Sequence, residues 1–164
     1  MLRRLFLLLV VTLGLLVTPV VAGIAKAGAQ PVARLSAVRA AAHPGYDRLV
    51  FQFAGPLPSV HLVTWVKQVV YDASGKTMVL PGKAFVRVVF KPASAHTSTG
   101  QVSVSYSGFV GGVVHLRVLH AVKLAGDFEA VLSFGVGLGQ KTRFDAFTLT
   151  KPARLIIDFA VPRG

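Results

Sequence analysis

The strongest constraint on the fold comes from two similar eight-residue segments near the ends of the chain, residues 46–53 and 152–159. Each contains Arg-Leu, two large apolar residues, one polar residue and Phe. Because side chains alternate between the two faces of a strand, each segment predicts a strand with one apolar face. The predicted inward residues are Leu49, Phe51, Phe53, Leu155, Ile157 and Phe159, with Arg48, Gln52, Arg154 and Asp158 facing outward. Two such strands predict a β-rich domain closed by its own ends; the alternative is a chance similarity between amphipathic strands.

Short alternating stretches separated by Gly and Pro fill the chain between these segments, and no long stretch has helical periodicity after the N-terminal region. This pattern predicts an all-β fold, a single β-sandwich of about eight mostly antiparallel strands, with an open barrel as the alternative. Residues 35–42 fit either a strand or a short helix. The other expected strands are residues 60–66, 78–80, 85–91, 101–107, 115–123, 127–134 and 143–149.

In residues 101–107, alternation predicts that Val102, Val104 and Tyr106 face inward. A strand opening at Asp127 would turn Phe128 inward, and the glycines at 135, 137 and 139 then predict a loop. The strand at residues 60–66 is apolar on both faces, which predicts that it is covered on both sides or lies at an interface.

The first 29 residues have the composition of an export signal. A basic start precedes a Leu/Val-rich stretch, Pro19 breaks any helix, and Ala27-Gly28-Ala29 is a small-x-small cleavage pattern. We therefore predict a signal peptide over residues 1–29, cleaved after Ala29, then a disordered start at residues 30–34 and a secreted or envelope-located domain.

A retained membrane anchor is the alternative to cleavage, because about 20 apolar residues span a bilayer and residues 5–24 are mostly apolar. In either case the N-terminal segment contacts the membrane during export. Arg3-Arg4 fits a twin-arginine export motif as well as the general secretory route.

The chain is strongly basic, with 18 Lys and Arg against 6 Asp and Glu and a net charge of +12. Removal of residues 1–29 takes away Arg3, Arg4 and Lys26 and leaves 15 basic against 6 acidic residues, a net charge of +9. Such a balance favours anionic partners, namely wall polymers, lipid headgroups or nucleic acid. Export makes nucleic acid the least expected partner. The alternative is that the positive charge only keeps the domain soluble.

The sequence contains no cysteine. This excludes disulfides, thiolate metal sites, cysteine nucleophiles and a lipid-modified N-terminal cysteine. The hydrophobic core alone must therefore hold the exported domain together.

Few residues suggest catalysis. Asp127 and Glu129 are two residues apart on one expected strand face and would lie roughly 6–7 Å apart. This spacing is similar to that of the paired carboxylates of a glycosidase. The favoured explanation is that these two residues form the solvated start of a strand. The five histidines form no metal-binding spacing, and His120 falls on an apolar face. There is no Gly-x-Ser-x-Gly motif. We predict no catalytic residue, no metal and no cofactor, and a wall hydrolase is the least favoured function.

Candidate binding residues follow from strand parity. Outward Arg48 and Arg154 can line a groove for an anionic or sugar ligand, or simply pair with the acidic residues of neighbouring strands. Trp65, the only tryptophan, can stack on a sugar or pack in the core. Four further cations are candidates for surface binding, because parity places each pair on the polar face of its own strand, and the sequence leaves open whether the two strands adjoin: Arg87 and Lys91, and Arg117 and Lys123.

Four short motifs, in this order and spacing, resemble the AMIN-like domain family over residues 35–161: His43-Pro-Gly-Tyr-Asp-Arg48, Gly82-Lys-Ala84, Gly126-Asp-Phe-Glu129 and Pro152-Ala-Arg-Leu-Ile-Ile-Asp158. This family occurs in exported, mostly actinobacterial proteins. The related AMIN domains are β-sandwich modules of envelope amidases and secretins and are taken to bind peptidoglycan or localise their host. Many AMIN-like members carry a lipoprotein cysteine or a Ser/Thr-rich linker, and this chain has neither.

The resemblance implies a secreted, non-catalytic cell-envelope module that binds peptidoglycan or another anionic wall polymer. The alternative is a structural domain that docks another envelope protein through a sheet edge or apolar face, which the two-sided apolar strand at residues 60–66 favours.

Overall fold

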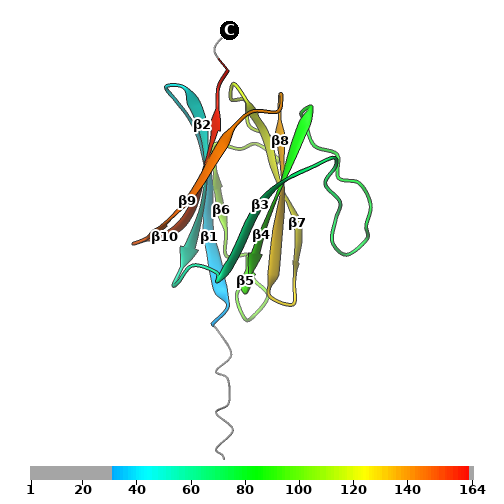
Figure 1. Ribbon diagram of the computed structural model, residues 1–164. Coiled ribbons are helices and arrows are strands. Elements are labelled where there is room, and N and C mark those ends of the chain that lie inside the picture. The colour runs from blue at the N-terminus through cyan, green and yellow to red at the C-terminus, as the bar shows by residue number, and fades with distance from the viewer. Residues whose placement is uncertain (1–30, 163–164) are drawn as a thin grey trace, which may run out of the picture.

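The computed structural model describes residues 31–162 and shows two β-sheets packed face to face (Figure 1). The described part has ten strands: β1 (Ala33–His43), β2 (Tyr46–Ala54), β3 (Val60–Val66), β4 (Ala84–Lys91), β5 (Ala93–Ser94), β6 (Ser105–Ser107), β7 (Leu119–Phe128), β8 (Val131–Leu138), β9 (Phe144–Thr150) and β10 (Ala153–Ala160). Sheet A has the order β5-β1-β2-β10-β9, with β6 also paired to β1, and sheet B has the order β3-β4-β8-β7. Only β5 and β6 pair in parallel, so the predicted, mostly antiparallel β-sandwich is confirmed. Within residues 31–162, no helix is long and apolar enough to cross a membrane. The predicted signal peptide lies outside the described residues.

The two similar sequence segments are neighbours at the centre of sheet A, as β2 and β10. Their antiparallel register sets Leu49 opposite Ile157 and Phe51 opposite Leu155, and these side chains are at most 1 % exposed. The predicted inward faces of both strands are confirmed. Because the last strand lies between β2 and β9, the sheet is complete only when both ends of the domain have come together.

Aromatic rings join the two sheets in the core. The ring centroid of Phe51, from sheet A, lies 5.1 Å from that of Phe90 and 5.0 Å from that of Phe134, both from sheet B. Tilted and edge-to-face arrangements at this spacing are the favourable ones for aromatic pairs. Both sheets and this core are built from residues 33–161, so the chain from Gln30 to Gly164 contains the whole described domain.

The connection between β3 and β4, residues 67–83, lies against the outer face of sheet B and explains the glycines of β8. A Cβ added to Gly137 would lie 2.1 Å from the Pro81 carbonyl oxygen, and one on Gly135 would lie 2.7 Å from the Val69 side chain. The predicted loop at these glycines is therefore wrong. They stand inside a strand because a neighbouring segment passes too close for any side chain.

The β7–β8 hairpin turns through Glu129 and Ala130, which have φ of +49° and +58°. Positive φ at both central residues is typical of a type I′ turn, a position that Asn-Gly normally occupies. The strand predicted to open at Asp127 instead ends at Phe128, which is 75 % exposed and not inward-facing. The prediction failed because neither Gly nor Asn marks this turn in the sequence.

Replacing Glu129 by Asn and Ala130 by Gly is expected to stabilise the domain by about 1 kcal/mol. A left-handed backbone conformation costs ordinary residues roughly 1–2 kcal/mol each. Part of the gain is offset because glycine increases the conformational entropy of the unfolded chain. Urea denaturation of residues 30–164 measures the change. As a control, Ala41→Gly in the exposed part of β1 is expected to destabilise. A loss of stability in the Asn-Gly variant would contradict the assigned turn.

Two other predicted strands were wrong in part or in full. Of residues 101–107 only Ser105–Ser107 form a strand, and the predicted inward residues Val102 and Tyr106 are 78 % and 44 % exposed. This segment runs along the edge of β1 in sheet A, and of the three residues predicted inward only Val104 packs partly against the core. The strand predicted at residues 78–80 is absent from the described structure, and Met78 and Leu80 are instead buried on the outer face of sheet B.

The domain begins slightly earlier than predicted. Ala33 and Arg34 pair in parallel with Ala93 and Ser94, and Ala33 is 1 % exposed. These two residues therefore belong to β1 and not to a disordered start at residues 30–34. The open choice between strand and helix at residues 35–42 is resolved as a strand.

β3 is an edge strand of sheet B, and it is not covered on both sides. Val63 and Trp65 pack partly against the core, whereas Val60 and Leu62 on the other face are 42 % and 55 % exposed. β9 is the edge of sheet A on the same side of the sandwich, because the rings of Trp65 and Phe144 lie 5.7 Å apart. Two bare strand edges therefore face the solvent on this side.

Candidate functional site

Trp65 lies near the end of β3, where the edges of the two sheets approach each other. Its indole packs against Phe144 at the start of β9 and is half-buried. The Lys141 ammonium lies over the indole, 5.6 Å from the ring centroid, which is a cation–π distance. Packing in the core, one of the two predicted roles, is confirmed in part, because Trp65 is half-buried against the core, and stacking on a sugar stays a prediction.

Four exposed cations surround this ring. Two hollows of about 380 and 440 Å³ are both lined by Trp65; Lys67, Lys83 and Lys141 line the first, and Arg143 lines the second. We call Trp65 with these four cations the Trp65 site. None of the ion pairs among residues 31–162 involves the four cations, and Asp145 is the one acidic residue that lines either hollow.

Local backbone contacts place these cations. The Lys83 N–H donates to the Leu138 carbonyl over 2.7 Å, and a Cβ on Gly82 would lie 2.6 Å from that same oxygen. Glycine at 82, with φ of +135°, is therefore needed for Lys83 to reach its position. On the other side, the Arg143 carbonyl accepts from the Ala160 N–H over 2.9 Å, which fixes the chain just before β9.

This arrangement suits a ligand that is anionic and has flat apolar faces. Four unpaired cations attract carboxylate or phosphate groups, and the exposed part of the indole offers a surface for a sugar ring. Each exposed contact contributes only about 0.2–1 kcal/mol, so useful affinity requires several of them at once and depends on salt.

The predicted outward arginines have different surroundings. Arg48 makes a bidentate pair with Asp158 across β2 and β10, with both N–O distances at 2.7 Å, and these hydrogen bonds raise the pKa of Arg48. Its guanidinium also lies 5.1 Å from the ring centroid of Tyr46 and 5.7 Å from that of Phe147. Arg154 stands opposite Gln52 in the register. Structural contacts thus occupy Arg48, and ligand binding by Arg48 and Arg154 stays a prediction.

The four predicted strand cations do not form one patch. Arg87 lies on β4 and Lys123 on β7, and β8 lies between these strands. Arg87 pairs with Asp72, and the Lys123 ammonium donates to the Val79 carbonyl over 3.2 Å, so both hold the β3–β4 connection. Lys91 is exposed at the end of β4.

Arg117 was expected on the same strand face as Lys123, and the structure places it elsewhere. It precedes β7, which begins at Leu119 and has a bulge between Leu119 and Ala121. Its guanidinium donates to the His43 carbonyl over 2.6 Å. The bulge interrupts the alternation of side chains between the two strand faces, and the prediction that Arg117 and Lys123 share a face depended on that alternation.

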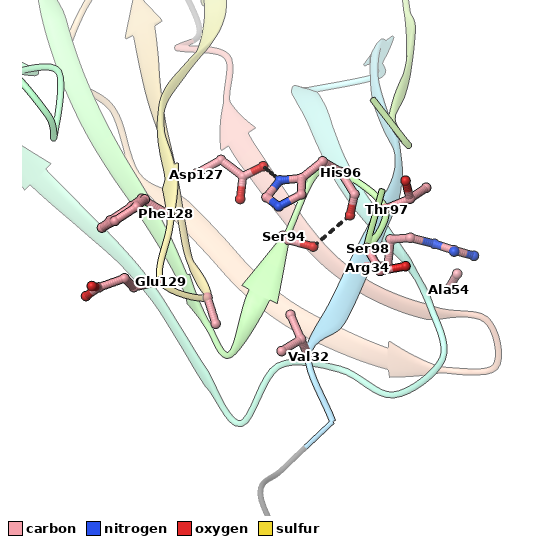
Figure 2. A pocket seen from close by; sticks show the side chains of 11 residues that line it. Val32, Arg34, Ala54, Ser94, His96, Thr97, Ser98, Asp127, Phe128 and Glu129 are labelled. Atoms are coloured by element: carbon pink, nitrogen blue, oxygen red, sulfur yellow. Dashed lines mark hydrogen bonds and ion pairs between the residues drawn. The ribbon is translucent and has the colours of Figure 1, made fainter. Parts of the chain in front are cut away.

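A hollow of about 830 Å³ lies at the end of the sandwich that carries the β7–β8 turn (Figure 2). There the Asp127 carboxylate accepts from the Ala95 N–H over 2.9 Å and lies 2.6 Å from His96 Nδ1. Ser94 is close by, but its hydroxyl donates to the His96 carbonyl over 3.0 Å. Asp127 thus ties the loop after β5 to β7. Asp127 and Glu129 do not share a strand face, because Glu129 lies in the turn.

A buried carboxylate, Asp47, links the two sheets on the inner face of β2. It is 0 % exposed, and its Oδ2 accepts from the N–H groups of Val118 and Leu119 over 2.6 and 3.0 Å. Its other oxygen, Oδ1, is buried without a hydrogen-bond partner. These contacts fix the start of β7 against β2 and make Asp47 a structural residue.

A family model described as the AMIN-like domain matches residues 33–161, from the first residue of β1 to just beyond β10. The resemblance predicted from the short motifs is confirmed. Comparison with curated proteins and with solved structures gives no match.

Proposed function

The chain belongs to the AMIN-like domain family, and from this membership we propose that it is an exported, non-catalytic module that binds an anionic polymer of the cell wall. AMIN-like domains are typically extracellular or envelope-associated. The proposal includes export through residues 1–29 and peptidoglycan or an attached acidic polymer as the ligand, with no role in binding nucleic acid.

The observation that carries this proposal is the Trp65 site. It combines a half-buried indole with four exposed cations that make no ion pair among residues 31–162, and acidic glycopolymers present anionic groups beside sugar rings. The Arg48–Asp158 and Arg87–Asp72 pairs, by contrast, already neutralise their cations within the fold.

The non-catalytic role is supported by the contacts of the acidic residues. Asp47 and Asp127 accept backbone N–H groups, and Asp72 and Asp158 pair with arginines. In this arrangement four of the six carboxylates are engaged in holding the fold. Hydrolysis of wall fragments by the purified protein, lost in Asp127→Asn, would instead establish a hydrolase.

Co-sedimentation of residues 30–164 with purified wall sacculi tests the proposal. Over a salt series from about 0.01 M to 1 M, the Debye length falls from about 30 Å to about 3 Å, so binding is expected at low salt and lost at high salt. Sacculi stripped of phosphate-containing polymers distinguish carboxylate from phosphate ligands. Absence of binding at low salt would refute the proposal, and salt-independent binding would contradict the role of the cations.

A further inference from the structure

We propose that two copies of this chain associate through the free edge of β9 and form a continuous sheet across a two-fold axis at Thr148. β9 is the last strand of sheet A, and its seven residues pair with β10 without a register shift. It contains no proline, lysine or arginine, the residues that commonly protect exposed edges.

Sheet B leaves room for a second strand beside β9. Ala146, Thr148 and Thr150 stand on the face of β9 that is turned toward sheet B, yet all three are exposed. In Figure 1 the tip of the β9–β10 hairpin diverges from β3. An incoming strand can therefore pair with this part of β9 without displacing β3.

The direction in which each backbone N–H and C=O group of β9 points determines which registers are possible with a second copy of β9. The Ala160 N–H donates to the Arg143 carbonyl, which continues the β9–β10 register. In an antiparallel ladder the hydrogen-bonded pairs alternate, so odd-numbered residues of β9 bond to β10 and even-numbered residues direct their N–H and C=O groups to the free edge. A second β9 must therefore match even residues with even residues.

Among these registers, the side chains favour the one centred on Thr148. It places Phe147 opposite Leu149 of the second copy, and these residues are 40 % and 39 % exposed in the single chain. It also places Asp145 opposite Lys151 of the second copy, whereas a centre at Phe147 would set Arg143 against Lys151. The Thr148 register gains about six backbone hydrogen bonds. This register places apolar side chains opposite apolar side chains and a negative charge opposite a positive one.

The association is expected to be weak, because one strand pair buries less surface than the interface of a stable dimer. Its consequence is bivalency. The Trp65 site adjoins Phe144, so the two sites of a dimer would be separated by about eight residues of strand, roughly 27 Å. Self-association does not depend on the identity of the ligand. The two copies of a dimer would bind one polymer together only if the Trp65 site binds a wall polymer, as proposed above.

Cysteine cross-linking tests the register, because the chain contains no cysteine. Under mild oxidation, residues 30–164 carrying Thr148→Cys are expected to form roughly tenfold more disulfide-linked dimer than the matched variant Thr64→Cys on the other bare edge, β3. A mixture of Phe147→Cys and Leu149→Cys should cross-link more than either variant alone. Equal cross-linking of Thr148→Cys and Thr64→Cys would overturn the proposal.

Sedimentation velocity without wall polymer gives the second measurement. The unmodified domain is expected to self-associate with rising concentration, and Thr148→Pro is expected to abolish this, because the Thr148 N–H faces the free edge and its loss leaves the pairing with β10 intact. A circular dichroism spectrum like that of the unmodified domain shows that the variant is folded. A domain that stays monomeric at millimolar concentration would contradict the inference, whatever its binding to sacculi.

Discussion

The double substitution Lys83→Glu with Lys141→Glu is expected to lower the affinity of residues 30–164 for wall sacculi by about 30-fold at low salt. Both side chains line the hollow beside Trp65 and make no ion pair among the described residues. The change removes two attractions and adds two repulsions of about 0.5 kcal/mol each, which together correspond to about 2 kcal/mol. Co-sedimentation at several protein concentrations measures the ratio, which should shrink as salt rises.

The matched control is Lys76→Glu with Lys91→Glu. Both lysines are exposed, neither lines a hollow at Trp65, and the change in net charge is the same. This control should retain most of the binding. An equal loss in both double variants would mean that binding follows total charge or the strand cations, and it would remove the Trp65 site from the account. Arg87 and Arg117 are less suitable probes, because their substitution also breaks contacts with Asp72 and His43.

The second large effect concerns stability, and Asp47→Ala is expected to cost about 3 kcal/mol. The substitution leaves the buried N–H groups of Val118 and Leu119 without acceptors, at about 1–3 kcal/mol each, and part of this is recovered because a buried charge is removed. Urea denaturation measures the difference in the free energy of unfolding.

Two variants accompany this measurement. Asp47→Asn keeps one acceptor oxygen and is expected to lose less stability than Asp47→Ala. Asp145→Ala removes an exposed carboxylate from β9 and should stay within about 0.5 kcal/mol of the unmodified domain. If Asp47→Ala is as stable as Asp145→Ala, the bridge from Asp47 to the start of β7 does not hold the sheets together.

Strand periodicity predicted those parts of the fold in which a strand is buried on one face. The inward residues of β2 and β10 follow directly from alternation, and so does their outward pair, Arg48 and Asp158. Each of these strands has a polar and an apolar face, and a shift by one residue would bury the wrong set.

Periodicity failed where another segment determines the environment. Gly135 and Gly137 resemble a loop in the sequence, but they stand in β8 because residues 67–83 pass over them. The turn at Glu129 and Ala130 has no sequence marker, since its left-handed residues are held by the strands on both sides.

The Trp65 site could be predicted only in part. Trp65 stood out as the single tryptophan, but its cations come from two separate connections: Lys67 and Lys83 from the two ends of the β3–β4 connection, and Lys141 and Arg143 from the segment before β9. The alternation of side chains along one strand does not predict which residues of separate connections lie close together. The available signal was that Lys67 follows an expected strand directly, Lys83 precedes another closely, and Lys141 stands just before a third, which Arg143 was expected to open.

A titration of Trp65 fluorescence with soluble fragments of wall polymer tests whether the ligand binds at the Trp65 site. Trp65 is the only tryptophan, so its emission reports on this site alone. We expect a saturable change in emission at low salt that disappears at high salt and is strongly weakened in Lys83→Glu with Lys141→Glu. Binding that is demonstrated by co-sedimentation but leaves the emission of Trp65 unchanged would contradict this expectation and place the ligand elsewhere on the domain.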